Sequence, residues 1–264
     1  MKNLFTFYTF LLLGFFLNAQ NLKSPDNNLD LNFSIDKKGR AFYSLNFHDK
    51  PVILNSGLGF ILKDNVEWMK IDTLDMMNNF KVLNVTFDSV DEYWNPVWGE
   101  ESEIRNNYNE MFVELEQKES ERKVNIRFRL FDDSLGFRYE FPLQEKLGSF
   151  IIIDEKTEFA MAGDHTAMWI PGDYDTQEYN YTTSKLSEIE QKSIEFREEN
   201  VSMYRFSNWA VQTALMMKSQ NGLYINIHEA ALIEYSAMHL EFNPVNMTFE
   251  SHLTPDAYGN MAYM

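Results

Sequence analysis

Short hydrophobic runs with a two-residue period are the feature that most constrains this chain. Apolar and polar side chains alternate in Leu29–Ile35, and the alternation returns in Ala41–Phe47 after a turn at residues 36–39. Because successive side chains of a strand point to opposite faces, such runs are typical of strands with one buried face. Further strands are predicted at residues 80–87, 111–116, 124–130, 136–141, 150–153, 212–217, 223–228 and 247–251. We therefore predict an all-β fold, a large antiparallel sandwich.

Helical signals are few. The charged segment Ser184–Glu199 is the main candidate, but its apolar residues Leu186, Ile189 and Ile194 fit a helical stripe poorly. We interpret it as an excursion from the sheets, similar to a lid.

The first residues indicate export. Lys2 precedes an apolar run, Leu4–Leu17, and Ala19 precedes a plausible cleavage point. The run is shorter than the roughly 20 residues that span a bilayer. We therefore expect residues 1–19 to be a signal peptide and the protein to reach the periplasm. The chain contains no cysteine, which argues against disulfides and against a lipid anchor. We expect no membrane anchor.

Composition narrows the partners. The formal net charge of −17 disfavours nucleic acid and anionic surfaces, which bind basic proteins. Aromatic residues make up 15% of the chain. They suit both a packed core and stacking on the apolar faces of sugar rings, and core packing accounts for most of them.

Trp94–Glu110 is an unusual segment with two tryptophans around Asn-Pro, followed by carboxylates and an arginine. We favour a long hairpin whose tryptophans pin it to the core. The alternative is an aromatic surface that faces a sugar or another domain.

Gly163–Tyr179 packs acids, amides and aromatics into a turn-rich stretch. Carboxylates and carbonyls are the ligands of Ca²⁺, but the spacing is not that of an EF-hand. A single carboxylate donated to a site shared with another domain is the more natural interpretation. The five histidines lack zinc-ligand spacing. His228 and Glu229 are adjacent on a predicted strand, so they should face opposite sides and not act on one atom.

Seven segments resemble glycoside hydrolase family 97, the periplasmic α-glucosidases of starch-utilisation systems. They are SPDNNL (Ser24–Leu29), PVWGEESEIRNNYNE (Pro96–Glu110), RFRLFDDSLGFRYEFP (Arg127–Pro142), WIPGDYDTQEYNYT (Trp169–Thr182), QTALMMK (Gln212–Lys218), GLYINIHEAAL (Gly222–Leu232) and LTPDAYG (Leu253–Gly259). The resemblance implies an N-terminal β-super-sandwich, similar to galactose-mutarotase folds, at residues 20–264. It further implies that residues 253–264 start the connection to a (β/α)₈ catalytic barrel absent from this chain.

The same resemblance assigns roles to two residues. It implies that Glu178 donates a ligand to Ca²⁺ shared with the barrel, and that Asn200 contacts the sugar. The catalytic glutamates are expected on the barrel, so no catalytic residue is expected here. The implied activity is inverting hydrolysis of an α-linked glucose oligosaccharide. Members that are retaining α-galactosidases keep that specificity open. The alternatives for this chain are a stand-alone carbohydrate-binding module, or a mutarotase-like sandwich without hydrolase activity.

Overall fold

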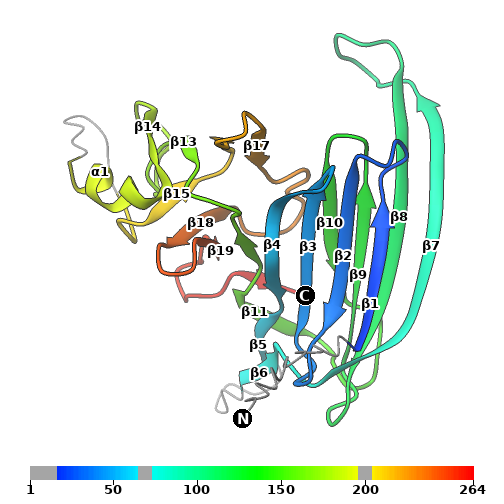
Figure 1. The fold of residues 1–264 in the computed structure, drawn as a ribbon. Coiled ribbons are helices and arrows are strands. Elements are labelled where there is room, and N and C mark those ends of the chain that lie inside the picture. Colours follow the sequence, from blue (N-terminus) through cyan, green and yellow to red (C-terminus); the bar gives the residue numbers. More distant parts are fainter. Residues whose placement is uncertain (1–16, 65–72, 196–203) are drawn as a thin grey trace, which may run out of the picture.

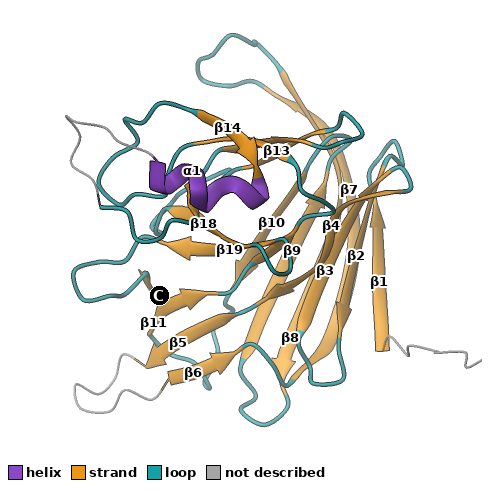
Figure 2. Cartoon of the chain, turned by 60° about the vertical axis from the view of Figure 1, so that its left-hand side comes forward, coloured by secondary structure: helices purple, strands orange, loops and turns teal. Residues whose placement is uncertain are grey.

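The structure is a computed structural model, and it describes residues 17–64, 73–195 and 204–264. These residues form five antiparallel sheets of four strands each, so the predicted all-β fold class is confirmed (Figures 1 and 2). The described residues contain no (β/α)₈ barrel; the family resemblance places that barrel outside this chain. None of the described helices has the length and apolar character needed to cross a membrane.

Three sheets come mainly from the first part of the chain. The first has the order β1 (Leu17–Lys23), β2 (Leu29–Ile35), β3 (Ala41–Phe47) and β4 (Lys50–Leu58). The second has the order β10 (Leu135–Glu140), β9 (Lys123–Leu130), β8 (Ile104–Gln117) and β7 (Phe80–Trp94). The third has the order β20 (Ala262–Tyr263), β11 (Phe150–Glu155), β5 (Phe60–Asp64) and β6 (Thr73–Met76).

Two sheets come from the later part of the chain. The fourth has the order β12 (Glu158–Ala160), β19 (Thr248–Leu253), β18 (Met238–Asn243) and β15 (Ala210–Gln212). The fifth has the order β14 (Thr182–Lys185), β13 (Thr166–Trp169), β16 (Leu215–Lys218) and β17 (Tyr224–Ile227). The single strand predicted at 212–217 is therefore wrong, because Gln212 pairs in the fourth sheet and Leu215 begins a strand of the fifth.

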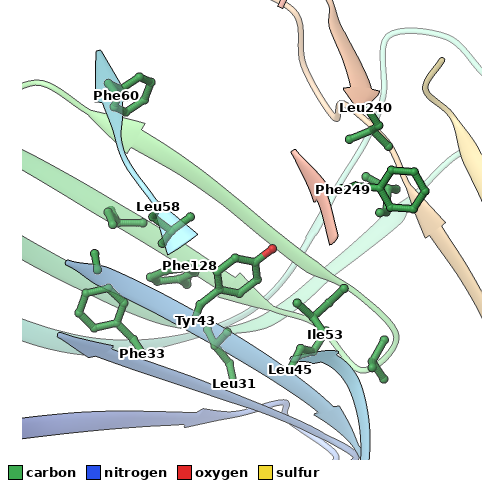
Figure 3. Close-up of a cluster of buried hydrophobic side chains, with 14 of the residues drawn as sticks. Leu31, Phe33, Tyr43, Leu45, Ile53, Leu58, Phe60, Phe128, Leu240 and Phe249 are labelled. Carbon is green, nitrogen blue, oxygen red and sulfur yellow. The ribbon is translucent and has the colours of Figure 1, made fainter. Parts of the chain in front are cut away.

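The core between the first two sheets follows from the alternation in the sequence. Every second residue of β2 is buried, and β9 repeats this pattern. Phe33 and Phe128 pack with ring centroids 5.9 Å apart, and Tyr43 lies against the same Phe128 ring (Figure 3). The Tyr43 hydroxyl donates to the Glu158 carbonyl at 2.9 Å, which links this core to the fourth sheet. Burial of such rings is the main stabilising term of a sandwich.

The turn between β2 and β3 requires a glycine. Gly39 has φ +74°, and a Cβ built there would lie 2.5 Å from the Phe80 nitrogen. The Gly39 carbonyl accepts a hydrogen bond from that Phe80 N–H at 3.0 Å. The close approach fixes the start of β7 against the hairpin, and any side chain at position 39 would break it.

The charged segment that follows β14 contains a short helix, although its apolar residues fit a helical stripe poorly. A 3₁₀ turn, η1 (Leu186–Glu188), leads into α1 (Ile189–Glu195). Leu186, Ile189 and Ser193 are buried, whereas Ile194 is exposed. A serine takes the place of a third apolar residue on the buried face, so the hydrophobic pattern of the sequence did not indicate a helix. Residues 196–199 of this segment lie outside the described residues.

The structure does not test the two predicted boundaries, the end of the signal peptide at residue 19 and the start of a connection at residue 253. Most of the predicted signal peptide lies outside the described residues, and β1 begins at Leu17. At the other end, Ala262 and Tyr263 pair with Ile152 and Ile151 of β11. Residues 253–264 thus include the end of β19 and a short strand, and their predicted role as the start of a connection stays a prediction.

Candidate functional site

The candidate site lies on the loop between β13 and β14, where the sequence places Glu178. The loop leaves the sheet at Gly172, whose N–H donates to the Ala210 carbonyl at 2.8 Å. A Cβ at Gly172 would lie 2.6 Å from the Ala210 Cβ. Only glycine allows this approach, so the loop begins in close contact with β15.

A buried carboxylate organises the loop. Asp173 is 3% exposed, and its Oδ1 accepts the N–H groups of Asp175 at 2.8 Å and Thr176 at 3.2 Å. Its Oδ2 accepts the Tyr179 hydroxyl at 2.6 Å and the Tyr204 N–H at 2.8 Å. Four donors satisfy the charge, as a buried carboxylate requires. One side chain therefore closes the loop on itself and joins it to the segment that begins at Tyr204.

Side chains from the fourth sheet hold the same loop from outside. His239 Nε2 lies 2.9 Å from the Asp173 carbonyl oxygen. Gln212 Nε2 donates to the Thr176 carbonyl at 2.7 Å, and both side chains are buried. Burial lowers the pKa of His239, which keeps its imidazole neutral near pH 7. A neutral ring with the proton on Nε2 can donate to that carbonyl.

An aromatic stack lies beside the loop. The rings of Tyr174, Phe206 and His252 pack against one another, and the Phe206 ring centroid lies 4.7 Å from that of Tyr174 and 4.0 Å from that of His252. The Tyr174 hydroxyl and His252 Nε2 form a hydrogen bond. Burial lowers the pKa of His252 and raises the pKa of the Tyr174 hydroxyl. Both groups therefore stay neutral over the physiological range.

Glu178 itself is exposed at the surface of this anchored loop. Its backbone N–H donates to Thr176 Oγ1 at 3.0 Å, so the main chain is fixed while the carboxylate faces outward. A cavity of about 460 Å³ borders the loop at Asp173–Gln177 and extends to His239 and Asp256. Glu178 directly follows the lining residue Gln177 but does not itself line the cavity.

The residues present fit the role of a single donated calcium ligand. Glu178 offers the oxygen chemistry that Ca²⁺ prefers. Within the described ranges no three His, Cys, Asp or Glu side chains group as a metal site. Since Ca²⁺ takes six to eight oxygen ligands, most of them would have to come from outside this part of the chain.

The other predicted residues have mixed outcomes. Asn200 lies outside the described residues. His228 is exposed, while Glu229 Oε1 accepts the Met238 N–H at 3.1 Å. β17 (Tyr224–Ile227) ends before both residues, so they lie in the loop that follows it, and the argument from strand alternation does not apply to them.

The tryptophan segment is a long hairpin, as we favoured, but the prediction that it is pinned to the core is wrong. β7 and β8 pair from Phe80 and Gln117 to Trp94 and Ile104, and their tip extends past the first sheet (Figure 1). Trp94 is 50% exposed and Trp98 is 88% exposed. The strands are too long for the first sheet to cover, so the aromatic side chains of the tip meet no core.

Sequence reasoning missed the anchors of the site. Asp173, Gln212, His239 and His252 were not singled out, although Asp173 opens the quoted Asp-Tyr-Asp-Thr motif. An aspartate two residues before a polar turn is a recognisable signal for a side chain that binds its own loop. The contact of His239 with the loop depends on tertiary structure, and no local pattern shows it.

Fold and site together define the class: a β-super-sandwich domain with an exposed carboxylate on an anchored loop. The family model for the glycosyl-hydrolase 97 N-terminal domain matches residues 22–260. The chain therefore belongs to glycoside hydrolase family 97, as its N-terminal domain, which confirms the resemblance seen in the sequence.

Known relatives agree with this assignment. The chain is 25% identical over 251 residues to a retaining alpha-galactosidase of Bacteroides thetaiotaomicron, covering 88% of this chain and 33% of the relative. A family 97 enzyme from Pseudoalteromonas sp. strain K8, in complex with acarbose, is 31% identical with a TM-score of 0.78. That match covers 93% of this chain and 33% of the enzyme.

Two further structures complete the comparison. A variant of the Pseudoalteromonas enzyme in complex with panose matches with a TM-score of 0.77 and 31% identity, over the same shares of the two chains. A beta-arabinopyranosidase structure shares the fold at 18% identity and a TM-score of 0.72, covering 93% of this chain and 38% of that one. The chain thus spans about a third of the length of the relatives it matches.

Proposed function

We propose that this chain is the N-terminal domain of a periplasmic, calcium-dependent α-glucosidase that acts with inversion. Family membership supports a glycoside hydrolase. Acarbose and panose in the Pseudoalteromonas complexes support an α-linked glucose oligosaccharide as substrate. The observation that carries the proposal for this chain is the exposed carboxylate of Glu178 on a loop fixed by a buried network.

In this proposal the domain supports a barrel that the chain does not span, and completes its active site. Hydrolysis with inversion needs one carboxylic acid to protonate the leaving oxygen and one carboxylate to activate water. Both are expected on the barrel. Asp173 holds the loop, Glu178 presents one oxygen ligand, and Asn200 contacts the sugar. When bound, Ca²⁺ supplies positive charge that orients and polarises the groups around it.

A second activity has specific support. The relative from Bacteroides thetaiotaomicron is a retaining alpha-galactosidase, so an α-galactosidase with retention is the alternative specificity. A stand-alone sugar-binding module or a mutarotase-like enzyme would instead need a site within this chain.

The test compares this 264-residue chain with a version extended through the downstream reading frame. Both receive a chromogenic α-glucoside and a chromogenic α-galactoside, with calcium and with a chelator. We expect calcium-dependent release from the α-glucoside by the extended form alone. Release from the α-galactoside alone would replace the specificity. Release by the short chain would move the chemistry onto the sandwich.

A further inference from the structure

Asp173 connects more of the candidate site than any role in local turn formation requires. Its Oδ1 binds the start of the Glu178 loop through two backbone N–H groups, and its Oδ2 binds the Tyr179 hydroxyl directly after Glu178. Residue 178 is therefore enclosed between two anchored points. The Thr176 carbonyl, held by Gln212, is a third anchor.

The anchors come from parts of the fold that are far apart in sequence. Tyr204 donates its N–H to Asp173 Oδ2, and the two backbones form an isolated bridge at Asp173 and Arg205. His239 binds the Asp173 carbonyl from β18. These contacts fix the loop relative to the strands of the sandwich. Its main chain is therefore ordered before any ligand binds.

We propose that Asp173 is the positioning residue of the calcium site, which fixes the Glu178 carboxylate in place for the metal. This inference rests on the proposed function of Glu178. Groups that hold a metal ligand commonly change metal affinity 10- to 100-fold when they are replaced. Asp173 acts only through the backbone and Tyr179, since its own oxygens are buried and already bonded.

Asparagine is the informative substitution. Its single carbonyl oxygen can still accept the N–H groups of Asp175 and Thr176, so the turn itself can form. Its amide NH₂ cannot accept the Tyr204 N–H, whereas it can donate to the Tyr179 hydroxyl once that hydroxyl turns its own proton away. Asp173→Asn therefore removes the negative charge and the acceptor of the Tyr204 N–H, and weakens the hold on Tyr179, while it keeps the volume of the side chain.

The experiment is a double-mutant cycle on calcium affinity in the extended protein, measured by titration calorimetry. The variants are Asp173→Asn, Glu178→Gln and the double variant. We expect Asp173→Asn to weaken calcium binding about 10- to 100-fold. In the Glu178→Gln background its further effect should fall below about twofold, because the two residues act through one ligand.

A matched control separates positioning from general loss of structure. Asp36 caps the turn between β2 and β3 in the same way, accepting the N–H groups of Lys38 at 2.8 Å and Arg40 at 2.9 Å. Asp36→Asn should leave calcium affinity unchanged. If Asp173→Asn fails to fold, Tyr179→Phe removes only the hydroxyl donated to Asp173, and should weaken calcium binding in the same direction.

The outcomes distinguish the two claims. A Glu178→Gln variant with unchanged calcium affinity would remove the calcium role of the proposed function, and the positioning role with it. If Glu178→Gln weakens binding and Asp173→Asn adds an equal loss in both backgrounds, Asp173 acts independently and only the positioning role is overturned. An Asp173→Asn variant with wild-type affinity also overturns it.

A readout without metal completes the test. With a chelator present and no calcium bound, the backbone amides of residues 175 and 176 should already exchange slowly in the wild type. The backbone amide of Tyr204 should exchange faster in Asp173→Asn, because that N–H loses its acceptor. Unchanged exchange at Tyr204 would contradict the anchoring on which the proposal depends.

Discussion

The first and second sheets form an apolar half of this domain, and the fourth and fifth sheets form a second half with different side chains in its interior. Between the first and second sheets the core is formed by aromatic and aliphatic side chains such as Phe33 and Phe128. Around the fourth and fifth sheets the interior also holds charged and polar groups, among them Asp173, Gln212 and His239. An apolar core depends on volume and pattern, whereas a polar one depends on particular hydrogen bonds. The second half should therefore respond to changes of single atoms, and it is the half that carries Glu178.

The largest expected effect is in the apolar half. Phe128 is fully buried, and Phe128→Ala should lower the free energy of unfolding by about 3–5 kcal/mol. Phe87 on β7 is 53% exposed, so the matched change Phe87→Ala should cost far less. Denaturant unfolding of this chain measures both. Equal losses would contradict the location of the core.

The next effect is at the entry to the candidate site. Gly172→Ala places a methyl group against Ala210, so the loop or β15 must shift, at a cost of about 1–3 kcal/mol. Gly136→Ala is the control, because nothing lies within 4 Å of a Cβ there. Thermal unfolding should separate the two variants. A Gly172→Ala protein as stable as the wild type would show that the loop is not held closely to β15.

A pH effect of smaller size should also come from the second half. Burial lowers the pKa values of His165, His239 and His252 below their ordinary value. Their contribution to stability is present above the unfolded pKa, near 6.5, and is lost as the pH falls through the lower folded pKa. Stability should therefore decrease from pH 7 toward pH 5.

The variant His239→Gln isolates one part of this decrease, because glutamine can still donate to the Asp173 carbonyl and does not titrate. The difference in unfolding free energy between wild type and His239→Gln should change in this pH range. Glu155, whose pKa burial raises, contributes with the opposite sign and cancels in the difference. A difference that is constant with pH would refute the assignment of His239 as a neutral group.

The smallest effect should be at the tip of the β7–β8 hairpin. Trp98→Ala should change the stability of this chain by no more than about 0.5 kcal/mol, because the side chain is 88% exposed. Denaturant unfolding provides the value. A loss of several kcal/mol would mean that the ring packs against the core after all.

The same contrast explains how much the sequence could predict. The alternation of Leu29–Ile35 and Ala41–Phe47 predicted β2 and β3 with their correct bounds, because apolar and polar residues alternate in a strand with one buried face. It could not show that the hairpin at Trp98 extends beyond the neighbouring sheet, since that depends on the lengths of strands distant in sequence. Glu178 was predicted from the family resemblance. The network of Asp173 with Tyr204 and His239 joins residues far apart in the chain, and no local pattern encodes it.

The most direct test of the account is calcium titration calorimetry of the extended protein and its Glu178→Gln variant. Glu145→Gln, an equal change at an exposed position, is the control. We predict that Glu178→Gln weakens calcium binding by at least about tenfold, since a charged oxygen ligand becomes neutral, while Glu145→Gln binds as the wild type does. Equal calcium affinity in all three proteins would contradict the claim that this domain donates Glu178 to a shared calcium site.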